Sequence, residues 1–188
     1  MRLFQTPRLF PCRTANYKNL MEKFYGKYRG TVVNNIDPNQ IGRLLVQVPD
    51  VLAVGLSSWA LPCFPVAGPQ MGAVSIPPIG AGVWVEFEQG DPDYPIWSGC
   101  WYGSAAEVPA LALATQPPIQ GFTLATALQN SITISDVPGP TGGILIKSKT
   151  GATIMVNDLG ITIQNGQGAS ITLTGPTVSI NNGALSII

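Results

Sequence analysis

The sequence predicts an all-β protein in two parts, a small barrel followed by a tail of short, repeated strands. Glycine (21) and proline (17) are abundant among the 188 residues, which is typical of many turns and few helices. Apolar and polar residues alternate with period two in many short runs, as in strands with one buried face. These runs are longer in residues 24–103 than in residues 121–188, so the two parts differ in kind.

The tail, residues 121–188, is the most regular stretch. Isoleucine, leucine or valine alternates with small polar residues in runs at 131–135, 144–147, 153–157, 161–164, 171–174, 178–181 and 185–188. From Ile163 on, apolar anchors recur every seven or eight residues, at Ile163, Ile171, Val178 and Leu185, which indicates a repeat. Strands this short cannot cover their own apolar face. We therefore expect identical chains to wind together as a β-prism or β-helix that closes the sheet edges.

The apolar positions of the tail are the expected interior of this assembly. Its predicted core comprises Ile144, Ile154, Ile163, Ile171, Val178 and Ile180. The alternation alone leaves open which face points inward. In several copies, Leu185, Ile187 and Ile188 would form an apolar patch at one end, and such a patch usually marks a binding surface. The alternative is that these residues only seal the end.

Residues 24–103 contain longer strands. We expect strands at 27–33, 43–49, 58–63, 83–88 and 95–101, separated by turns rich in Asn, Asp, Gly and Pro. Gly30 indicates a bulge or bend in the first strand, and Pro62 favours an edge position for the third. Five strands in roughly eighty residues is the size of a small Greek-key barrel such as the OB-fold.

Composition argues against several function classes. Ten basic residues balance ten acidic ones, so the charge excess of a nucleic-acid-binding protein is missing. The chain has no histidine, the commonest general base and transition-metal ligand, and Ser57 and Ser58 therefore lack a partner for a hydrolase triad. Four carboxylates could act as a glycosidase pair, but they are better explained as solvated groups beside a turn: Glu86, Glu88, Asp91 and Asp93. We predict no enzymatic activity, no cofactor and no metal site.

Aromatic rings and cysteines have simple interpretations. OB-folds can stack sugars or single-stranded nucleic acid on exposed rings. With so few basic residues, we assign most of the rings to the barrel core or a subunit interface: Tyr25, Tyr28, Trp59, Trp84, Trp97 and Trp101. The chain has three cysteines, an odd number, and they lie far apart in the sequence: Cys12, Cys63 and Cys100. This predicts free thiols and assembly in a reducing cytosol.

Several motifs of the barrel region resemble one family. They lie at residues 25–32, 37–38, 42–44, 46–49, 59–62 and, most densely, 77–99. Residues 24–103 look like the OB-fold module of the central baseplate spike. That family includes the spikes of contractile-tailed phages, the valine–glycine-repeat spikes of type VI secretion and the spikes of extracellular contractile injection systems. The tail resembles the family's trimeric β-helical needle.

The resemblance implies an OB-fold barrel followed by a C-terminal trimeric β-helix with a structural role. We expect an N-terminal extension (1–23), the barrel (24–103), a linker (104–120) and the intertwined needle (121–188). Some members carry a lysozyme domain between barrel and needle, and this linker is too short to house one. Others hold iron at the tip through paired histidines, which this chain lacks.

The resemblance also implies partners. A PAAR-type tip protein is expected on Leu185, Ile187 and Ile188, and hub or tube baseplate proteins at the N-terminal end. The homotrimer would assemble in the cytoplasm as part of a phage tail or tail-like particle and meet the target envelope transiently, without binding nucleic acid. Two alternatives are a trimeric carbohydrate-binding adhesin or tail-fibre fragment, and a single-strand-binding OB protein.

Overall fold

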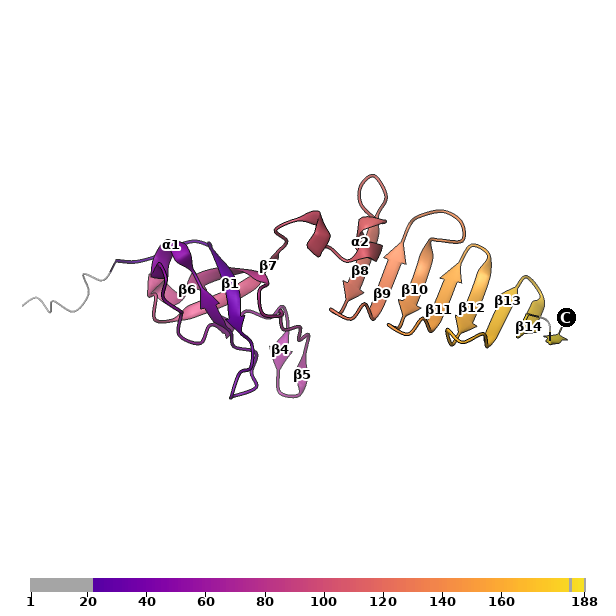
Figure 1. Ribbon diagram of the computed structural model, residues 1–188, viewed down its shortest axis with the longest axis horizontal. Helices are drawn as coiled ribbons and strands as arrows, with labels where there is room; N and C mark the ends of the chain where they lie inside the picture. The colour runs from indigo at the N-terminus through magenta and orange to yellow at the C-terminus, as the bar shows by residue number, and fades with distance from the viewer. Residues whose placement is uncertain (1–21, 183, 188) are drawn as a thin grey trace, which may run out of the picture. The chain divides into compact units, whose positions relative to one another are not determined.

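The computed structural model describes residues 22–182 and 184–187, and strands are the commonest secondary structure among them (Figure 1). The chain divides into two units, Met1–Trp101 and Tyr102–Ile188. The predicted N-terminal extension lies almost entirely outside the described residues. Within the described part of the chain, no helix combines the length and the apolar character needed to cross a membrane.

The first unit contains a closed five-stranded sheet. Its strands are β1 (Tyr28–Asn34), β2 (Leu45–Gln47), β3 (Leu61–Pro62), β6 (Gly82–Phe87) and β7 (Pro95–Trp101), in the order β2-β1-β6-β7-β3. All pairs are antiparallel except β3 with β7. An antiparallel bridge between Leu44 and Ala60, with N···O distances of 3.1 and 2.8 Å, joins the two ends of this order. The strand order and its closure are those of a small OB-type barrel.

The core of the barrel follows from the alternation in its strands. In β6, Val83, Val85 and Phe87 are buried, while the residues between them are half-buried. The buried apolar set is Val32, Leu44, Val46, Val48, Ala60, Val83, Val85, Phe87 and Trp97. Each large side chain contributes about 1.5–3 kcal/mol by leaving water. The first unit therefore has a complete core of its own.

Two sequence expectations in this unit are wrong. Of the bulge or bend expected at Gly30, the bulge is wrong, because Gly30 pairs regularly with Val83 and the register of β1 shifts between Val32 and Asn34 instead. Gly30 is needed for space, since a Cβ there would lie 2.8 Å from Val85 Cγ2. Glu88 does not share a strand with Glu86, because β6 ends at Phe87 and Glu88 begins a short 3₁₀ helix.

Short elements that the sequence did not predict complete the chain. They are α1 (Pro49–Leu52), the hairpin β4 (Ala67–Gly68) and β5 (Met71–Gly72), η1 (Glu88–Gly90), η2 (Ala105–Glu107) and α2 (Ala110–Leu113). As expected for an edge position, β3 lies at the end of the strand order, where Pro62 pairs with Trp97, and the bridge that closes the sheet is made just before β3 by Ala60. The last two short helices lie in the stretch predicted to be a linker.

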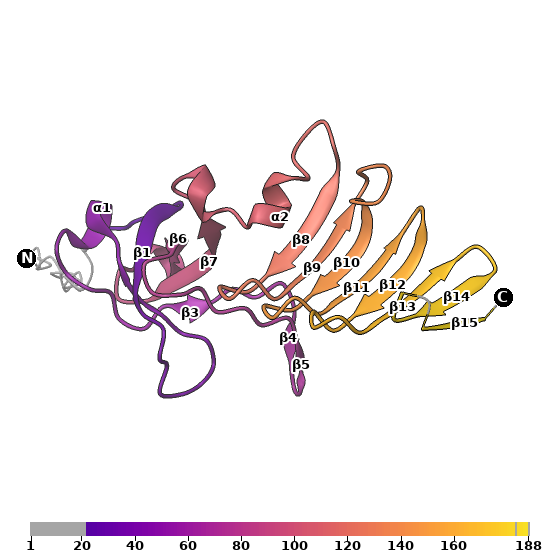
Figure 2. The same ribbon diagram turned by 45° about the vertical axis from the view of Figure 1, so that its right-hand side comes forward.

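The second unit is an eight-stranded antiparallel sheet in which each strand pairs with the next along the chain (Figure 2). The strands are β8 (Gly121–Ala125), β9 (Ser131–Ser135), β10 (Gly143–Lys147), β11 (Thr153–Asn157), β12 (Gly160–Gln164), β13 (Ser170–Thr174), β14 (Thr177–Ile180) and β15 (Leu185–Ile187). Gly160 opens β12 with φ +140°, and a Cβ there would collide with the carbonyl oxygen of Leu173. Glycine is therefore required at this tight turn.

Candidate assembly interface

The sheet of the second unit has two chemically different faces. On one face, side chains from successive strands form two apolar rows in cross-strand register. The first row is Phe122, Ile134, Ile144, Val156, Ile161, Leu173 and Val178, and the second is Leu124, Ile132, Ile146, Ile154, Ile163, Ile171, Ile180 and Leu185. We call these two rows the apolar face. Every strand from β8 to β14 contributes one residue to each row.

The apolar face is uncovered in a single chain. Most of its large side chains are exposed, with exposed fractions from 36% at Ile161 to 57% at Leu124. Val178 and Ile180 are half-buried. A contiguous apolar surface of this kind marks an interaction site. Covering the remaining exposed area would contribute about 1 kcal/mol for each side chain. Such a gain, repeated along the sheet, makes association of this face strongly favourable.

The opposite face is polar and partly covered by the chain itself. Its central row is Thr123, Thr133, Leu145, Met155, Thr162, Thr172 and Ser179. On β9, Thr133 is only 5% exposed. Leu111 of α2 and Ile119 line a cavity together with Thr133, so the segment before β8 packs over this face. The apolar face is thus the one left open for other chains.

All six predicted needle-core residues lie on the apolar face. Ile144 and Val178 belong to the first row, and Ile154, Ile163, Ile171 and Ile180 to the second. The sequence analysis did not name Phe122, Leu124, Ile146 and Val156, although the same alternation could have identified them. That these side chains form the interior of an assembly stays a prediction at this point.

The predicted tip residues are described only in part. Leu185 lies in β15, pairs with Ile180 and is 53% exposed. The backbone of Ile187 pairs with that of Val178. Ile188 lies outside the described residues. The binding of a tip protein by these three residues stays a prediction.

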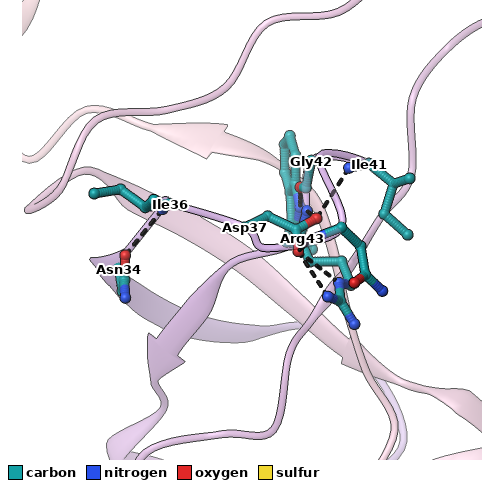
Figure 3. A network of polar contacts seen from close by, with 8 residues as sticks. Asn34, Ile36, Asp37, Ile41, Gly42 and Arg43 are labelled. Atoms are coloured by element: carbon teal, nitrogen blue, oxygen red, sulfur yellow. Dashed lines mark hydrogen bonds and ion pairs between the residues drawn. The ribbon is translucent and has the colours of Figure 1, made fainter.

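In the first unit, a polar network fixes the loop between β1 and β2 (Figure 3). The carboxylate of Asp37 accepts hydrogen bonds from the backbone N–H groups of Asn39, Ile41 and Arg43 at 2.9, 3.0 and 3.2 Å. It also pairs with the Arg43 guanidinium, with Nη2 at 2.7 Å and Nε at 3.0 Å from Oδ1. The guanidinium and then the backbone donors hold the pKa of Asp37 well below its usual range, although burial of the carboxyl acts in the opposite direction.

This network presents two apolar side chains on a fixed loop. Trp97 donates from Nε1 to the carbonyl oxygen of Gly42 at 3.0 Å, which anchors the loop to the core. Ile36 is 77% exposed and Ile41 is 51% exposed. Together with Phe64 and Ile76, both residues line one cavity at the barrel surface. The loop is therefore an ordered apolar surface of the barrel.

The other candidate residues have structural surroundings. Glu86 pairs with Lys27 at 2.9 Å and Asp91 with Lys23 at 3.5 Å, which satisfies two of the four carboxylates considered for chemistry. Within the part of the chain that the structure describes, no three His, Cys, Asp or Glu side chains gather as they would around a metal ion. Cys63 and Cys100 are free, as predicted, and Cys12 lies outside the described residues.

The aromatic rings are mostly packed rather than open. Trp97 is 4% exposed, and the guanidinium of Arg29 lies over Trp101 and Trp84, 5.1 and 5.9 Å from the ring centroids. Arg43 lies over Trp59 in the same way, at 5.4 Å. Of the six rings considered, only Tyr25 is classed as exposed. Trp59, Trp84 and Trp101 thus carry a guanidinium on one face, where a sugar or base would otherwise stack.

Comparison with known proteins links both units to one family. Residues 28–102 match the type VI secretion system/phage-baseplate injector OB domain, and residues 121–186 match the phage baseplate V C-terminal trimerisation domain. The chain belongs to the baseplate spike family. These matches confirm the predicted all-β fold with an OB barrel, and the trimerisation domain supports a homotrimer.

A relative of this chain is the type VI secretion system spike protein VgrG5 of Pseudomonas aeruginosa. It is 34% identical to this chain over 107 residues, which are 55% of this chain. The chain spans 12% of the length of that relative. Spikes of this family are structural components of a tail-like particle, in agreement with the role predicted from the sequence.

Proposed function

We propose that three copies of this chain form the central spike of a contractile injection machine and that the needle pierces the target envelope. The observation that carries this proposal is the apolar face, which continues through all strands from β8 to β14 in a region that matches a trimerisation domain. A single copy leaves this face in water. Three copies that turn it inward would form a prism with an apolar interior.

The mechanism is mechanical, and the chain makes or breaks no bond in its target. Each strand of the sheet is hydrogen-bonded to the next, and packing of three sheets against each other would prevent them from bending. Sheath contraction would then push a stiff rod forward. The sequence has no charged side chain between residues 159 and 188, so this segment avoids the large cost of moving charges into a membrane.

Solution mass tests the trimer directly. We expect light scattering of the purified chain to give three times 19.8 kDa, since the apolar face favours association. The expected mass should not change upon tenfold dilution from micromolar concentrations. A compact monomer at working concentrations would contradict the proposal.

The end of the needle would bind a PAAR-type tip protein through Leu185, Ile187 and Ile188. Three copies of these apolar residues would lie together around one axis, which supports a binding patch. We expect the double variant Ile187→Asp/Ile188→Asp to lose pull-down of a PAAR-type protein while the trimer mass is retained. The matched control Ile36→Asp changes an exposed isoleucine of the barrel and should keep pull-down. Retained pull-down with the double variant would refute the tip site.

At the other end, hub or tube proteins of the baseplate would bind the barrel, and the particle would assemble in the cytoplasm. Exposed Ile36 and Ile41 on the fixed loop support a protein contact there. Co-purification with tube or hub proteins tests this contact. The adhesin alternative has less support because guanidinium groups cover one face of Trp59, Trp84 and Trp101, and glycan-array binding would favour it instead.

A further inference from the structure

Residues 121–188 contain four charged side chains, and like charges lie at the same edge of the sheet. Lys147 ends β10 and Lys149 lies in the turn that joins β10 to β11. Asp136 directly follows β9 and Asp158 lies in the turn that joins β11 to β12. Because the strands are antiparallel, successive turns alternate between the two edges (Figure 2). We call them the lysine edge and the aspartate edge.

The two edges do not neutralise each other within one chain. All four side chains are exposed, and none of them joins an ion pair among the residues that the structure describes. A five-residue strand separates the edges, which corresponds to roughly 15 Å. This distance exceeds the Debye length of about 8 Å at physiological salt. Asp158 Oδ2 accepts a hydrogen bond from the backbone N–H of Gly139 at 2.9 Å, and its other oxygen and the remaining three charged groups are available to another molecule.

A threefold rotation brings unlike edges together. When three copies turn their apolar faces inward, each sheet forms one wall and meets its neighbours at its edges. Rotation does not mirror the sheet, so the lysine edge of one copy always adjoins the aspartate edge of the next. The lysines and aspartates also lie at similar heights along the threefold axis, because both lysines lie between Asp136 and Asp158 in strand order. Each lysine is within about one strand spacing, roughly 4.8 Å along the axis, of an aspartate.

We propose that the lysine edge of each copy forms ion pairs with the aspartate edge of a neighbouring copy and that these pairs set the axial register of the trimer. This inference rests on the trimer proposed above. The apolar rows distinguish between registers only weakly, because each strand presents a similar pair of large aliphatic residues to the interior and a slide uncovers side chains only at the ends of the sheet. A slide by two strands would keep apolar side chains in contact and preserve the alternation of edges.

The ion pairs act at one level of the needle. After Asp158 the sequence has no further charged side chain up to residue 188. The axial register of residues 159–188 therefore depends on the ion pairs beside β9–β12. Charged residues specify partner and register in the same way at the flanks of coiled coils.

Two hydroxyl groups without partners lie on the same level. Ser131 and Thr153 are the register partners of Lys147 on its two sides. Their side-chain oxygens are buried and have no hydrogen-bond partner within the described residues. Buried hydroxyl groups without partners are destabilising. Because these oxygens are already covered within one chain, the two hydroxyl groups take no part in the contact between copies.

Charge reversal tests the proposal in the full chain. The variant Lys147→Glu/Lys149→Glu places carboxylates against the aspartate edge, and Asp136→Lys/Asp158→Lys places ammonium groups against the lysine edge. We expect each reversal to make the trimer dissociate at least roughly tenfold more readily, since several exposed pairs are lost and replaced by repulsion. The quadruple variant restores opposite charges between copies and should regain most of the lost stability. Dissociation is measured by light scattering over a dilution series.

The outcomes separate this inference from the proposed function. If the unchanged chain is not a trimer, the proposed function fails first. If the unchanged chain is a trimer and both charge-reversal variants dissociate at the same concentration as the unchanged chain, the ion pairs are absent. Only this inference is then overturned. A quadruple variant no more stable than the reversals would also overturn it. Zero-length carbodiimide cross-linking should join the lysine-edge peptide of one chain to the aspartate-edge peptide of an isotope-labelled copy, and exclusively intrachain products would contradict the register.

Discussion

At the scale of single residues, Asp37 determines the conformation of the loop between β1 and β2. Its carboxylate accepts three backbone hydrogen bonds and pairs with Arg43, and its side chain is 4% exposed. No other residue type offers two negatively charged acceptor atoms at this length of side chain. The sequence analysis used Asp37 only as part of a family motif, because its partners come from the loop that it folds.

The Asp37 pair predicts a specific dependence of stability on pH. The pKa is lower in the folded chain than in the unfolded chain, so the stabilisation is fully present above the ordinary aspartate pKa of about 3.9. It is lost as the pH falls through the lower folded value. We expect Asp37→Asn to lower the melting temperature at pH 7 and to reduce the loss of stability below pH 4. Thermal unfolding followed by tryptophan fluorescence measures both effects.

Asp93→Asn is the matched control for this prediction. Asp93 lies in an exposed turn, and its carboxylate joins no ion pair among the described residues. We expect this control to change the melting temperature little at either pH. An Asp37→Asn chain that keeps the acid sensitivity of the unchanged chain would show that another group is responsible.

At the scale of elements, period-two alternation predicted most of the sheet. The expected runs at 131–135 and 153–157 coincide with β9 and β11, and the long runs 27–33 and 95–101 differ from β1 and β7 by at most one residue at each end. This success has a physical reason, since each strand has one apolar side and the chain reverses at glycine, asparagine or proline. Alternation also places the six predicted core residues on one face.

Other features of the elements could not be predicted from the sequence. The hairpin of β4 and β5 has two residues in each strand, too few to show a period. The exact pairing of Gly30 with Val83 depends on a distant strand. Which face the chain itself covers became clear only from the packing of Leu111 and Ile119 over the polar face. The charged edges were missed because a sequence does not show which turns share an edge until the strand order is known.

The two faces of β12 give a matched pair of substitutions. Ile163 lies on the apolar face, and its neighbour Thr162 lies on the polar face. We expect Ile163→Asp to abolish the trimer, because three carboxylates would be buried near the axis at a cost of several kcal/mol each. Thr162→Asp should leave the trimer intact. Light scattering distinguishes the two, and equal masses for both variants would contradict an inward apolar face.

At the scale of the whole chain, the two units gain stability in different ways. The barrel buries nine apolar side chains within one chain. The second unit has no comparable interior among its described residues, and its apolar side chains remain exposed until other copies cover them. Folding of the barrel should therefore be independent of protein concentration, while stability of the needle should increase with concentration.

The distribution of tryptophan allows this difference to be measured. All four tryptophans lie between residues 59 and 101, so their fluorescence reports the barrel, whereas far-ultraviolet circular dichroism reports both units. We expect the fluorescence midpoint of thermal unfolding to stay constant over a hundredfold range of concentration. The dichroism signal should contain a second transition that moves to higher temperature with increasing concentration, because dilution favours dissociated chains. Lys147→Glu/Lys149→Glu should lower only this second transition. Coincident transitions at every concentration would mean that barrel and needle unfold as one cooperative unit, and the barrel would then depend on the trimer for its stability.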